Sequence, residues 1–316
     1  MQTFPPVPKF PTGFVLLLIF LSLFVFQSLS GASGPLVFTP LPLTNPERVV
    51  AESRNLAEHL GMVLGREVRV RFEPDYATIL ERFAQGEIDL VHLGPLPFAI
   101  LRAMAPQAEP VVFFQDRDGA TTYSCALAAA MDLGAGGAHS GPVALTQPLS
   151  TCGFLATAAL LQRTGHALDR MPHAHLGSHE AVALALVRGE YSAGGLRVSI
   201  GESYTEIGLR LLDQTIPLPG FALVANRTTL GEAALELLRR ELVRISLEQP
   251  ERLAGWVGLG RWGMAPVSLT DYCSLRGLRE PEAPRELVRS PVMTDCGGLD
   301  CSLIDVFLEE TCREDP

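Results

Sequence analysis

Short apolar strands alternate with helices along most of the chain, and this alternation restricts the fold more than any other feature of the sequence. Residues 36–39 are apolar and predict a strand. Asn45-Pro46-Glu47 then opens a helix that continues to Leu64, with proline in its first turn. Residues 68–72 alternate apolar and charged side chains with the period of a strand. Strands and helices that alternate in this way form βαβ units, which predicts an α/β fold with mostly parallel sheets flanked by helices.

The alternation restarts after a break near residues 115–122, so we expect two α/β blocks. A second crossing near residues 214–221 leads back to the first block. Two crossings predict two lobes joined by a two-strand hinge, with a cleft that closes around a ligand.

The other predicted elements follow the same alternation of strands and helices. The predicted strands are 88–92, 111–114, 125–130, 143–145, 209–213 and 221–224. The predicted helices are one capped by Asp75 and ending at Gly86, 94–104, 150–164, 180–188 capped by Ser178, and one that starts at the capping box Thr229-x-x-Glu232 and ends near Gln249.

The domain boundaries follow from these crossings. Lobe I comprises residues 35–117 and 220–278, and lobe II comprises residues 118–219. Residues 279–316 are rich in proline and charge and then in cysteine, so they form an appended tail. Residues 134–141, which are rich in glycine and alanine, are expected to form a surface loop.

The N-terminus predicts export. Lys9 precedes the apolar run Phe14–Phe26, and small residues follow up to Ala32. Thirteen apolar residues are too few to cross a bilayer, which needs roughly 20, so residues 1–32 are predicted to be a signal peptide of a periplasmic protein. An uncleaved membrane anchor is the alternative. The six cysteines are an even number, as expected for disulfides in an exported protein, and a staple is expected where three of them crowd the tail, at Cys296, Cys301 and Cys312.

Charge and composition exclude several classes of function. The net charge of −10 excludes nucleic-acid binding through a general basic field. Lys9 is the only lysine, so the mature chain has no catalytic or Schiff-base lysine. The sequence also lacks a phosphate-binding Walker loop, a dinucleotide fingerprint and a Gly-x-Ser-x-Gly nucleophile motif.

The most informative local motif precedes the helix that begins near residue 150. Ser150 and Thr151 supply hydroxyl groups at the helix start, where up to four N–H groups are free and the helix dipole is positive. Gly153 is expected to let a ligand approach the backbone. Such a cap suits a tetrahedral oxyanion.

Seven short segments in fixed order resemble the phosphonate-, phosphite- and phosphate-binding proteins of ABC importers. They span about residues 35–278, nearly the whole mature chain except the tail. Each segment alone is weakly specific, but their order and spacing together are characteristic. The segments are Asp75-Tyr76-Ala77, Gly86-Glu-Ile-Asp-Leu90, Leu93-Gly-Pro-Leu96, Thr122-Tyr123-Ser124, Ser150-Thr-Cys-Gly153, Gly177-Ser-His-Glu-Ala181 and Ile216-Pro217.

The resemblance implies a two-lobed periplasmic binding protein of type II. Its ligand is expected to be phosphate, phosphite or a simple phosphonate, handed to an ABC permease by a monomeric protein without a cofactor. In the family a Ser-Thr-Ser cap, a histidine and two tyrosines hold the oxyanion. Carried over, these residues are Ser150, Thr151 and Cys152, with His179, Tyr76 and Tyr123. At Cys152 a thiol, which is a weaker donor, replaces the third hydroxyl.

The chain departs from the family where aminophosphonate-binding members carry carboxylates. The corresponding positions fall near Arg197 and near Pro219-Gly220, and neither is acidic. Nothing there neutralises an ammonium group, so we expect no preference for aminoalkyl phosphonates. Arg197 is either a charge-assisted contact to the anion, or to a second negative group, or a solvated surface residue.

Three alternatives remain open at this point. Cys152 at a helix N-terminus with His179 as partner would make a thiol hydrolase, unless another cysteine such as Cys125 bridges it. His173, His175 and His179 could bind Zn²⁺, but Gly177 interrupts their geometry, and we expect no metal. A binding protein could also present its ligand to a membrane sensor instead of an importer.

Overall fold

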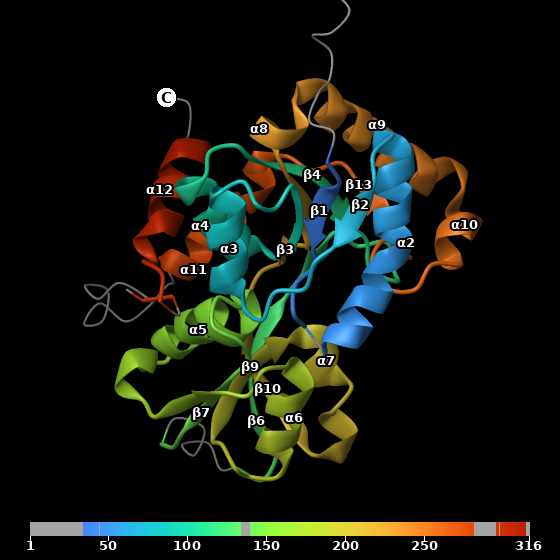
Figure 1. Cartoon of the computed structure of the whole chain (residues 1–316). Coiled ribbons are helices and arrows are strands. Elements are labelled where there is room, and N and C mark those ends of the chain that lie inside the picture. The colour runs from blue at the N-terminus through green and yellow to red at the C-terminus, as the bar shows by residue number, and fades with distance from the viewer. Residues whose placement is uncertain (1–33, 44, 134–139, 281–294, 297, 314–316) are drawn as a thin grey trace, which may run out of the picture. The chain divides into compact units, whose positions relative to one another are not determined.

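The computed structural model describes residues 34–43, 45–133, 140–280, 295–296 and 298–313 (Figure 1). Residues 1–32, to which the sequence assigns a signal peptide, lie outside this part of the chain, as do residues 134–139 of the predicted surface loop. The described residues from Leu36 onward form one compact unit. In the described part, no helix combines the length and the apolarity that a bilayer crossing requires.

The first sheet has six strands in the order β13-β4-β12-β3-β1-β2. Strands β1 to β4 all run in one direction, because β1 is parallel to β2 and β3, and β12 is antiparallel to both β3 and β4. Only β12 and β13 run the other way, so most strands are parallel, as predicted. The strands are β1 (Leu36–Thr39), β2 (Val68–Val70), β3 (Leu90–Leu93), β4 (Ala108–Phe114), β12 (Ala222–Asn226) and β13 (Met264–Ala265).

Helices cover both faces of this sheet. Successive strand residues point to opposite faces, so Leu90 packs into one apolar cluster with α2 and α9, while Val91 packs into another with α3 and α4. Figure 1 shows these two helix pairs on either side of the strands. The helices of this part are α2 (Pro46–Leu64), α3 (Tyr76–Ala84), α4 (Pro95–Met104), α8 (Arg227–Leu230), α9 (Glu232–Glu248) and α10 (Pro250–Ala254).

The second sheet has five strands in the order β10-β6-β9-β7-β8. Strand β7 is parallel to β8 and β9, and only β6 runs against the others. Its strands are β6 (Cys125–Ala130), β7 (Val143–Leu145), β8 (His173–His175), β9 (Ala193–Arg197) and β10 (Leu209–Gln214). Its helical elements are the π-helical segment η2 (Thr151–Ala156), α5 (Thr157–Arg163), η3 (Leu168–Arg170), α6 (His179–Val187), α7 (Val198–Glu202) and η4 (Thr205–Ile207).

Two connections link the sheets, and they pair with each other. Strand β5 (Thr122–Tyr123) and strand β11 (Leu218–Pro219) form a separate antiparallel ribbon, with Tyr123 opposite Leu218. Both lie in the crossings that the sequence predicts. Gly220 follows directly, and a side chain there would lie 2.6 Å from the carbonyl oxygen of Thr121, so only glycine allows the two connections to approach this closely.

Three predicted helix caps are correct, and one is not. Asn45, Asp75 and Ser178 each cap their helix through the side chain, as expected. The capping box at Thr229 is wrong, because Thr229 lies inside the short helix α8, whose cap is Asn226. Helix α9 begins only after Gly231, whose φ of 81° interrupts the helical backbone between α8 and α9.

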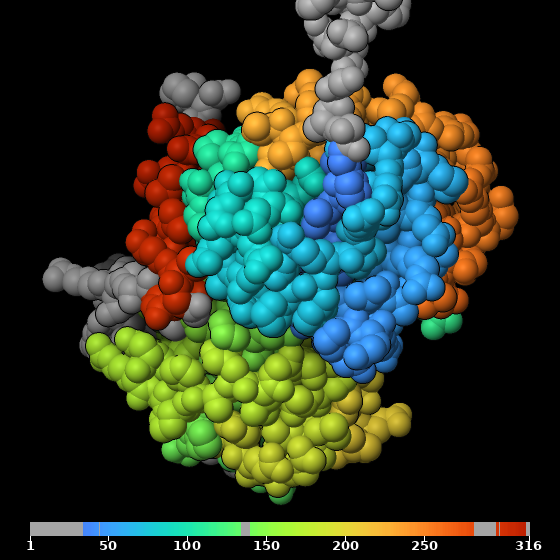
Figure 2. Space-filling view, viewed as in Figure 1, coloured from blue at the N-terminus to red at the C-terminus, as the bar shows by residue number. Residues whose placement is uncertain are grey.

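The tail ends in a helix that packs on the first sheet's helices. In α12 (Ser302–Thr311), the ring of Phe307 lies 5.9 Å from that of Phe98 on α4. Figure 2 shows this segment, in red, on the flank of the teal surface of α3 and α4. Disulfides join Cys273 to Cys312 and Cys296 to Cys301, which confirms the staple expected in the tail. Cys273 lies on the 3₁₀ helix η5 (Leu269–Leu275), which is followed by α11 (Arg276–Arg279).

Candidate ligand-binding site

A small cavity lies between elements of the two sheets. Of the eight candidate residues, seven line it: Tyr76, Tyr123, Ser150, Thr151, Cys152, His179 and Arg197. They come from α3, β5, η2, α6 and β9, which are far apart in the sequence. The fold therefore collects in one place nearly all the side chains that the sequence analysis selects.

Four helical segments begin at this cavity. Tyr76 is the first residue of α3, His179 is the first residue of α6, and Thr151 is the first residue of η2, which continues into α5. The fourth is α4, whose cap Gly94 also lines the cavity. Each helix start carries about half a positive charge, although caps already bond some of its N–H groups, such as those of Thr78 on α3 and Ala181 on α6. Together the four helix starts make a site that attracts an anion, although the described lining residues include no unpaired cationic side chain.

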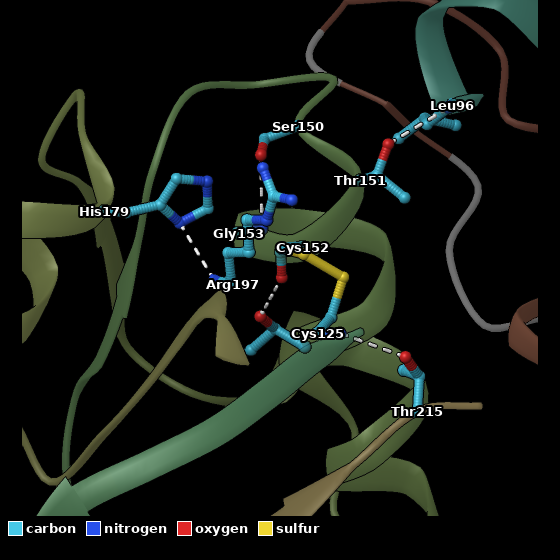
Figure 3. The surroundings of a disulfide bond; sticks show 10 residues. Leu96, Cys125, Ser150, Thr151, Cys152, Gly153, His179, Arg197 and Thr215 are labelled. Carbon is cyan, nitrogen blue, oxygen red and sulfur yellow. Dashed lines mark hydrogen bonds between the residues drawn. A yellow bond between two sulfur atoms is a disulfide. The ribbon is translucent and has the colours of Figure 1, made fainter. Parts of the chain in front are cut away.

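The Ser150–Thr151 cap is buried and connects the two sheets. The Ser150 Oγ accepts a hydrogen bond from the Gly153 N–H at 3.2 Å, while the Thr151 Oγ1 accepts one from the Leu96 N–H on α4 at 3.1 Å. The Thr151 hydroxyl also hydrogen-bonds to the phenol of Tyr123. Figure 3 shows the hydrogen bond between Thr151 and Leu96. Thr151 thus connects the start of η2 to Leu96 on α4 and to Tyr123 on β5.

The helix at this cap does not start as a regular α-helix, contrary to expectation. Its first six residues, Thr151–Ala156, form a π-helical segment before α5 begins. The Thr157 hydroxyl donates to the Cys152 carbonyl at 2.8 Å, five residues back along the chain. Such wider turns are rare and concentrate at functional sites.

The residue before the cap has a strained backbone. Leu149 has a φ of 64°, and in the described residues it is the only residue other than glycine with positive φ. A left-handed conformation costs a side-chain-bearing residue roughly 1–2 kcal/mol. Leu149 is fully buried and also lines the cavity, so its packing holds this conformation.

Cys152 is bonded to Cys125 on β6, and both are buried (Figure 3). The expectation of a thiol donor at Cys152 is therefore wrong, since the sulfur carries no hydrogen. The thiol hydrolase hypothesis is wrong for the same reason, because a bridged sulfur is not a nucleophile. The disulfide instead fixes the first turn of η2 to a central strand of the second sheet.

Gly153 does not line the cavity. A Cβ at this position would lie 1.9 Å from the Thr146 hydroxyl. The sequence predicts that this glycine lets a ligand approach the backbone. In the structure, the absence of a side chain at Gly153 instead lets η2 pack against Thr146, which follows β7.

His179 is a neutral hydrogen-bond donor at pH 7. Burial lowers the pKa of its imidazole to about 4. Its Nδ1 accepts a hydrogen bond from the Arg197 N–H at 3.3 Å (Figure 3). The proton of the neutral ring consequently resides on Nε2, which leaves one N–H for a further partner.

Arg197 lines the cavity, but its charge is already balanced. Its guanidinium pairs with Asp116 and stacks over the Tyr123 ring, 4.8 Å from the centroid. Its Nε is buried and has no hydrogen-bond partner in the described residues. Asp116 lies in the first connection between the sheets, and no motif in the sequence marks it as a partner of Arg197.

Both tyrosines remain protonated. Burial raises the pKa of the Tyr76 phenol, and it raises that of Tyr123 to about 12. Their hydroxyl groups are therefore donors at neutral pH. The other residues of the cavity wall could not be singled out from the sequence, because they are apolar residues, a glycine and a glutamine without a motif for binding. They are Leu41, Leu43, Gly94, Pro97, Gln147, Leu149 and Phe221.

The other two histidines of the suspected metal cluster are already bonded elsewhere. The Nδ1 of His173 hydrogen-bonds to the Met171 carbonyl, and that of His175 to the Thr146 carbonyl. Within the described ranges, no three His, Cys, Asp or Glu side chains gather as metal ligands.

Comparison with known proteins identifies a family and a fold. Residues 38–272 match the family described as "ABC transporter, phosphonate, periplasmic substrate-binding protein". A phosphate-import protein of Mycolicibacterium smegmatis is 27% identical over 274 residues, which are 78% of this chain and 85% of that protein.

Two solved structures illustrate the shared fold. A phosphonate-binding protein of Prochlorococcus marinus in complex with methylphosphonate has a TM-score of 0.65 and 17% identity, over 78% of this chain and 97% of its own. A binding protein component of an ABC phosphonate transporter of Pseudomonas aeruginosa has a TM-score of 0.62 and 18% identity, over 88% and 97%. The fold is that of a periplasmic binding protein, as predicted.

Proposed function

Because the chain belongs to the phosphonate family of periplasmic substrate-binding proteins of ABC transporters, we propose that it binds phosphate, phosphite or a simple phosphonate in the cavity around Ser150 and Thr151. A protein of this family is a transport component and not an enzyme. The observation that carries the proposal is the convergence of four helix starts on one cavity with uncharged donors. Relatives that import phosphate or bind methylphosphonate support the same ligand class.

Each candidate side chain has a role in this proposal. Ser150 donates its hydroxyl to the oxyanion, together with N–H groups at the start of η2, and Thr151 donates once its proton turns from the Tyr123 phenol to the ligand. His179 donates from Nε2. Tyr76 and Tyr123 donate their phenols from the side of the first sheet and the connection. These groups replace the water that a tetrahedral anion loses, and neutral donors at helix starts are sufficient for that.

Arg197 has a supporting role. Its buried Nε is directed to no protein acceptor in the described residues, so an oxyanion would give it a partner. The pair of Arg197 and Asp116 is neutral overall, so the anion gains a charge-assisted hydrogen bond from the guanidinium but little net Coulomb attraction.

Ligand binding closes the cleft in this proposal. Lobe I consists of residues 35–117 and 220–278, lobe II of residues 118–219, and the ribbon of β5 and β11 is the hinge. Support comes from the strand assignment, since each sheet draws all its strands from one proposed lobe. Residues 279–316 are a tail of lobe I, because α12 packs on α4.

The family is periplasmic, which implies export. We propose that residues 1–32 are the export signal and that it is cleaved. The mature protein then acts as a monomer that delivers its ligand to the permease of an ABC importer. A closed lobe arrangement is what the permease would recognise.

Binding is tested with the full chain, exported through its own leader and purified from the periplasm. Thermal shift is recorded with phosphate, phosphite, methylphosphonate, 2-aminoethylphosphonate and sulfate after ligand removal by partial unfolding. A ligand at 100 times its Kd adds about 2.7 kcal/mol of stability. At least one phosphorus oxyanion should stabilise the protein, and no response to any of them would refute the proposal.

A pair of variants tests the site itself. Ser150→Ala/Thr151→Ala should weaken binding by about 1–3 kcal/mol for each buried hydrogen bond lost. Ser268→Ala is the matched control, because it also removes a serine cap, but at η5, outside the cavity. Equal affinity of the double variant and the parent would show that the oxyanion binds elsewhere.

A further inference from the structure

A second cavity adjoins the proposed oxyanion site. Leu43, Tyr123, Arg197 and Phe221 line both cavities. The wall between them is therefore a single layer of side chains. A substituent on a bound phosphorus oxyanion has only this layer to pass before it enters the second cavity.

Aromatic rings form much of the second cavity. His92 lies edge-on to Phe114, with ring centroids 5.2 Å apart, and 5.0 Å from Phe221, which in turn stacks on Tyr123 at 5.9 Å. Burial lowers the pKa of His92 to about 3, so this imidazole is an uncharged flat ring at pH 7. These rings lie at the separations at which aromatic side chains attract one another.

Trp262 completes the aromatic lining from a glycine-rich loop. Gly258, Gly260 and Gly263 all have positive φ, so the loop turns sharply and brings Trp262 to the cavity. The indole is 45% exposed, which is unusual for so large an apolar side chain. The guanidinium of Arg261 lies over it at 4.7 Å from the ring centroid. Stacking of this kind holds the indole in place at the edge of the cavity.

The second cavity offers no unpaired carboxylate among the residues that the structure describes. Asp116 is the one carboxylate that lines it in the described part of the chain, and it is paired with Arg197. Arg261 is exposed to solvent and stacked on Trp262. An ammonium group would find no unpaired carboxylate here to neutralise its charge. An uncharged ring needs no such partner and would contact the aromatic faces.

We propose that the second cavity is a subsite for an aromatic substituent, so that the protein prefers phosphorus oxyanions bearing an aryl ring to those bearing a small alkyl group. The inference rests on the proposed function, because the oxyanion must sit in the first cavity for its substituent to reach the second. The ligand class is a phosphoryl group attached to an aromatic ring, either directly as a phosphonate or through oxygen as a phosphate ester.

Calorimetric titration of the exported full-length protein tests this preference. The probes are phenylphosphonate, phenyl phosphate, methylphosphonate, 2-aminoethylphosphonate and phosphonoacetate. The phenyl compounds should bind about tenfold or more tightly than methylphosphonate. Comparison of phenylphosphonate with phenyl phosphate distinguishes the two sources of the aryl group.

The residue-specific readout is the ratio of phenylphosphonate to methylphosphonate affinity. Trp262→Ala should reduce this ratio to near one, and Trp262→Phe should restore most of it. Leu247→Ala is the matched control, because Leu247 is 77% exposed on α9, outside both cavities, and the ratio should not change. Trp256→Phe leaves Trp262 as the only tryptophan, and phenylphosphonate should then change its fluorescence.

Each outcome separates the two proposals. If methylphosphonate and phenylphosphonate bind equally, or if Trp262→Ala leaves their ratio unchanged, the aromatic subsite is wrong while the oxyanion site stands. If phosphonoacetate binds most tightly, the subsite takes an anion and the inference is overturned. If no phosphorus oxyanion binds, the proposed function itself fails.

Discussion

The disulfide between Cys125 and Cys152 allows a quantitative prediction, because it closes a loop of known length at the candidate site. The two residues are 27 positions apart, and both are buried. Replacing both by alanine removes the cross-link from the unfolded chain and leaves no thiol behind. The variant should unfold more easily than the parent.

The loop length determines the expected loss. In the chain-entropy account, a loop of 27 residues restricts the unfolded state by about 3.5 kcal/mol at 25 °C. The bridge between Cys296 and Cys301 spans only 5 positions, and the same account gives about 2 kcal/mol. The two double-alanine variants should therefore differ by about 1.5 kcal/mol.

Urea unfolding followed by circular dichroism measures both variants against the parent. Equal slopes of the unfolding free energy against urea would show that the denatured states are comparable. Ligand titration in the same samples adds a second readout. Only Cys125→Ala/Cys152→Ala should weaken ligand binding, because only this bridge holds the first turn of η2.

The tail bridge supplies the refuting result. If Cys296→Ala/Cys301→Ala costs as much stability as Cys125→Ala/Cys152→Ala, loop length does not govern these bridges. If the Cys125→Ala/Cys152→Ala variant binds ligand as tightly as the parent, the disulfide does not position the cap.

Three further predictions concern packing and pH. Gly153→Ala should cost about 1–3 kcal/mol through overlap with Thr146, and Thr146→Ala should rescue part of that loss; full stability of Gly153→Ala alone would refute the packing role. Leu149→Gly should destabilise the protein by about 1 kcal/mol less than Leu145→Gly. Both leucines are fully buried, but only at position 149 does glycine remove the strain of a left-handed backbone. Urea unfolding of the two variants measures this difference. Stability should rise with pH from about 4 to 6.5, because the unfolded chain binds protons at His179 and His92 in this window and the folded chain does not; His179→Gln should reduce the slope by the share of one proton and leave the share of His92, and an unchanged slope would contradict the neutral His179 ring.

Features that depend on neighbouring residues were predictable from the sequence. The caps Asn45, Asp75 and Ser178 bond to backbone groups three residues ahead, so the local pattern contains all the information. The strand pattern of residues 68–72 was predictable for the same reason, although the strand β2 ends at Val70. Seven of the eight candidate residues line one cavity, and six of these, all except Arg197, come from the family motifs.

Features that depend on distant residues were not predictable. Gly153 is required by Thr146, which the fold places beside it, and Arg197 is balanced by Asp116, 81 positions away. The sequence left the pairing of the cysteines open, because the fold, and not the spacing along the chain, decides which sulfurs meet. Thr229 satisfied a local capping pattern, yet Asn226 occupies the cap because strand β12 ends there.

The position of β12 has a consequence for the order in which the molecule assembles. It lies between β3 and β4 in the first sheet, but the chain reaches it only after the whole second sheet. A growing or partly exported chain that ends before Ala222 therefore has two open strand edges where the centre of its first sheet belongs. Such edges invite pairing with other chains. Folding is safest when the entire chain is available at once, as it is after passage across a membrane in unfolded form.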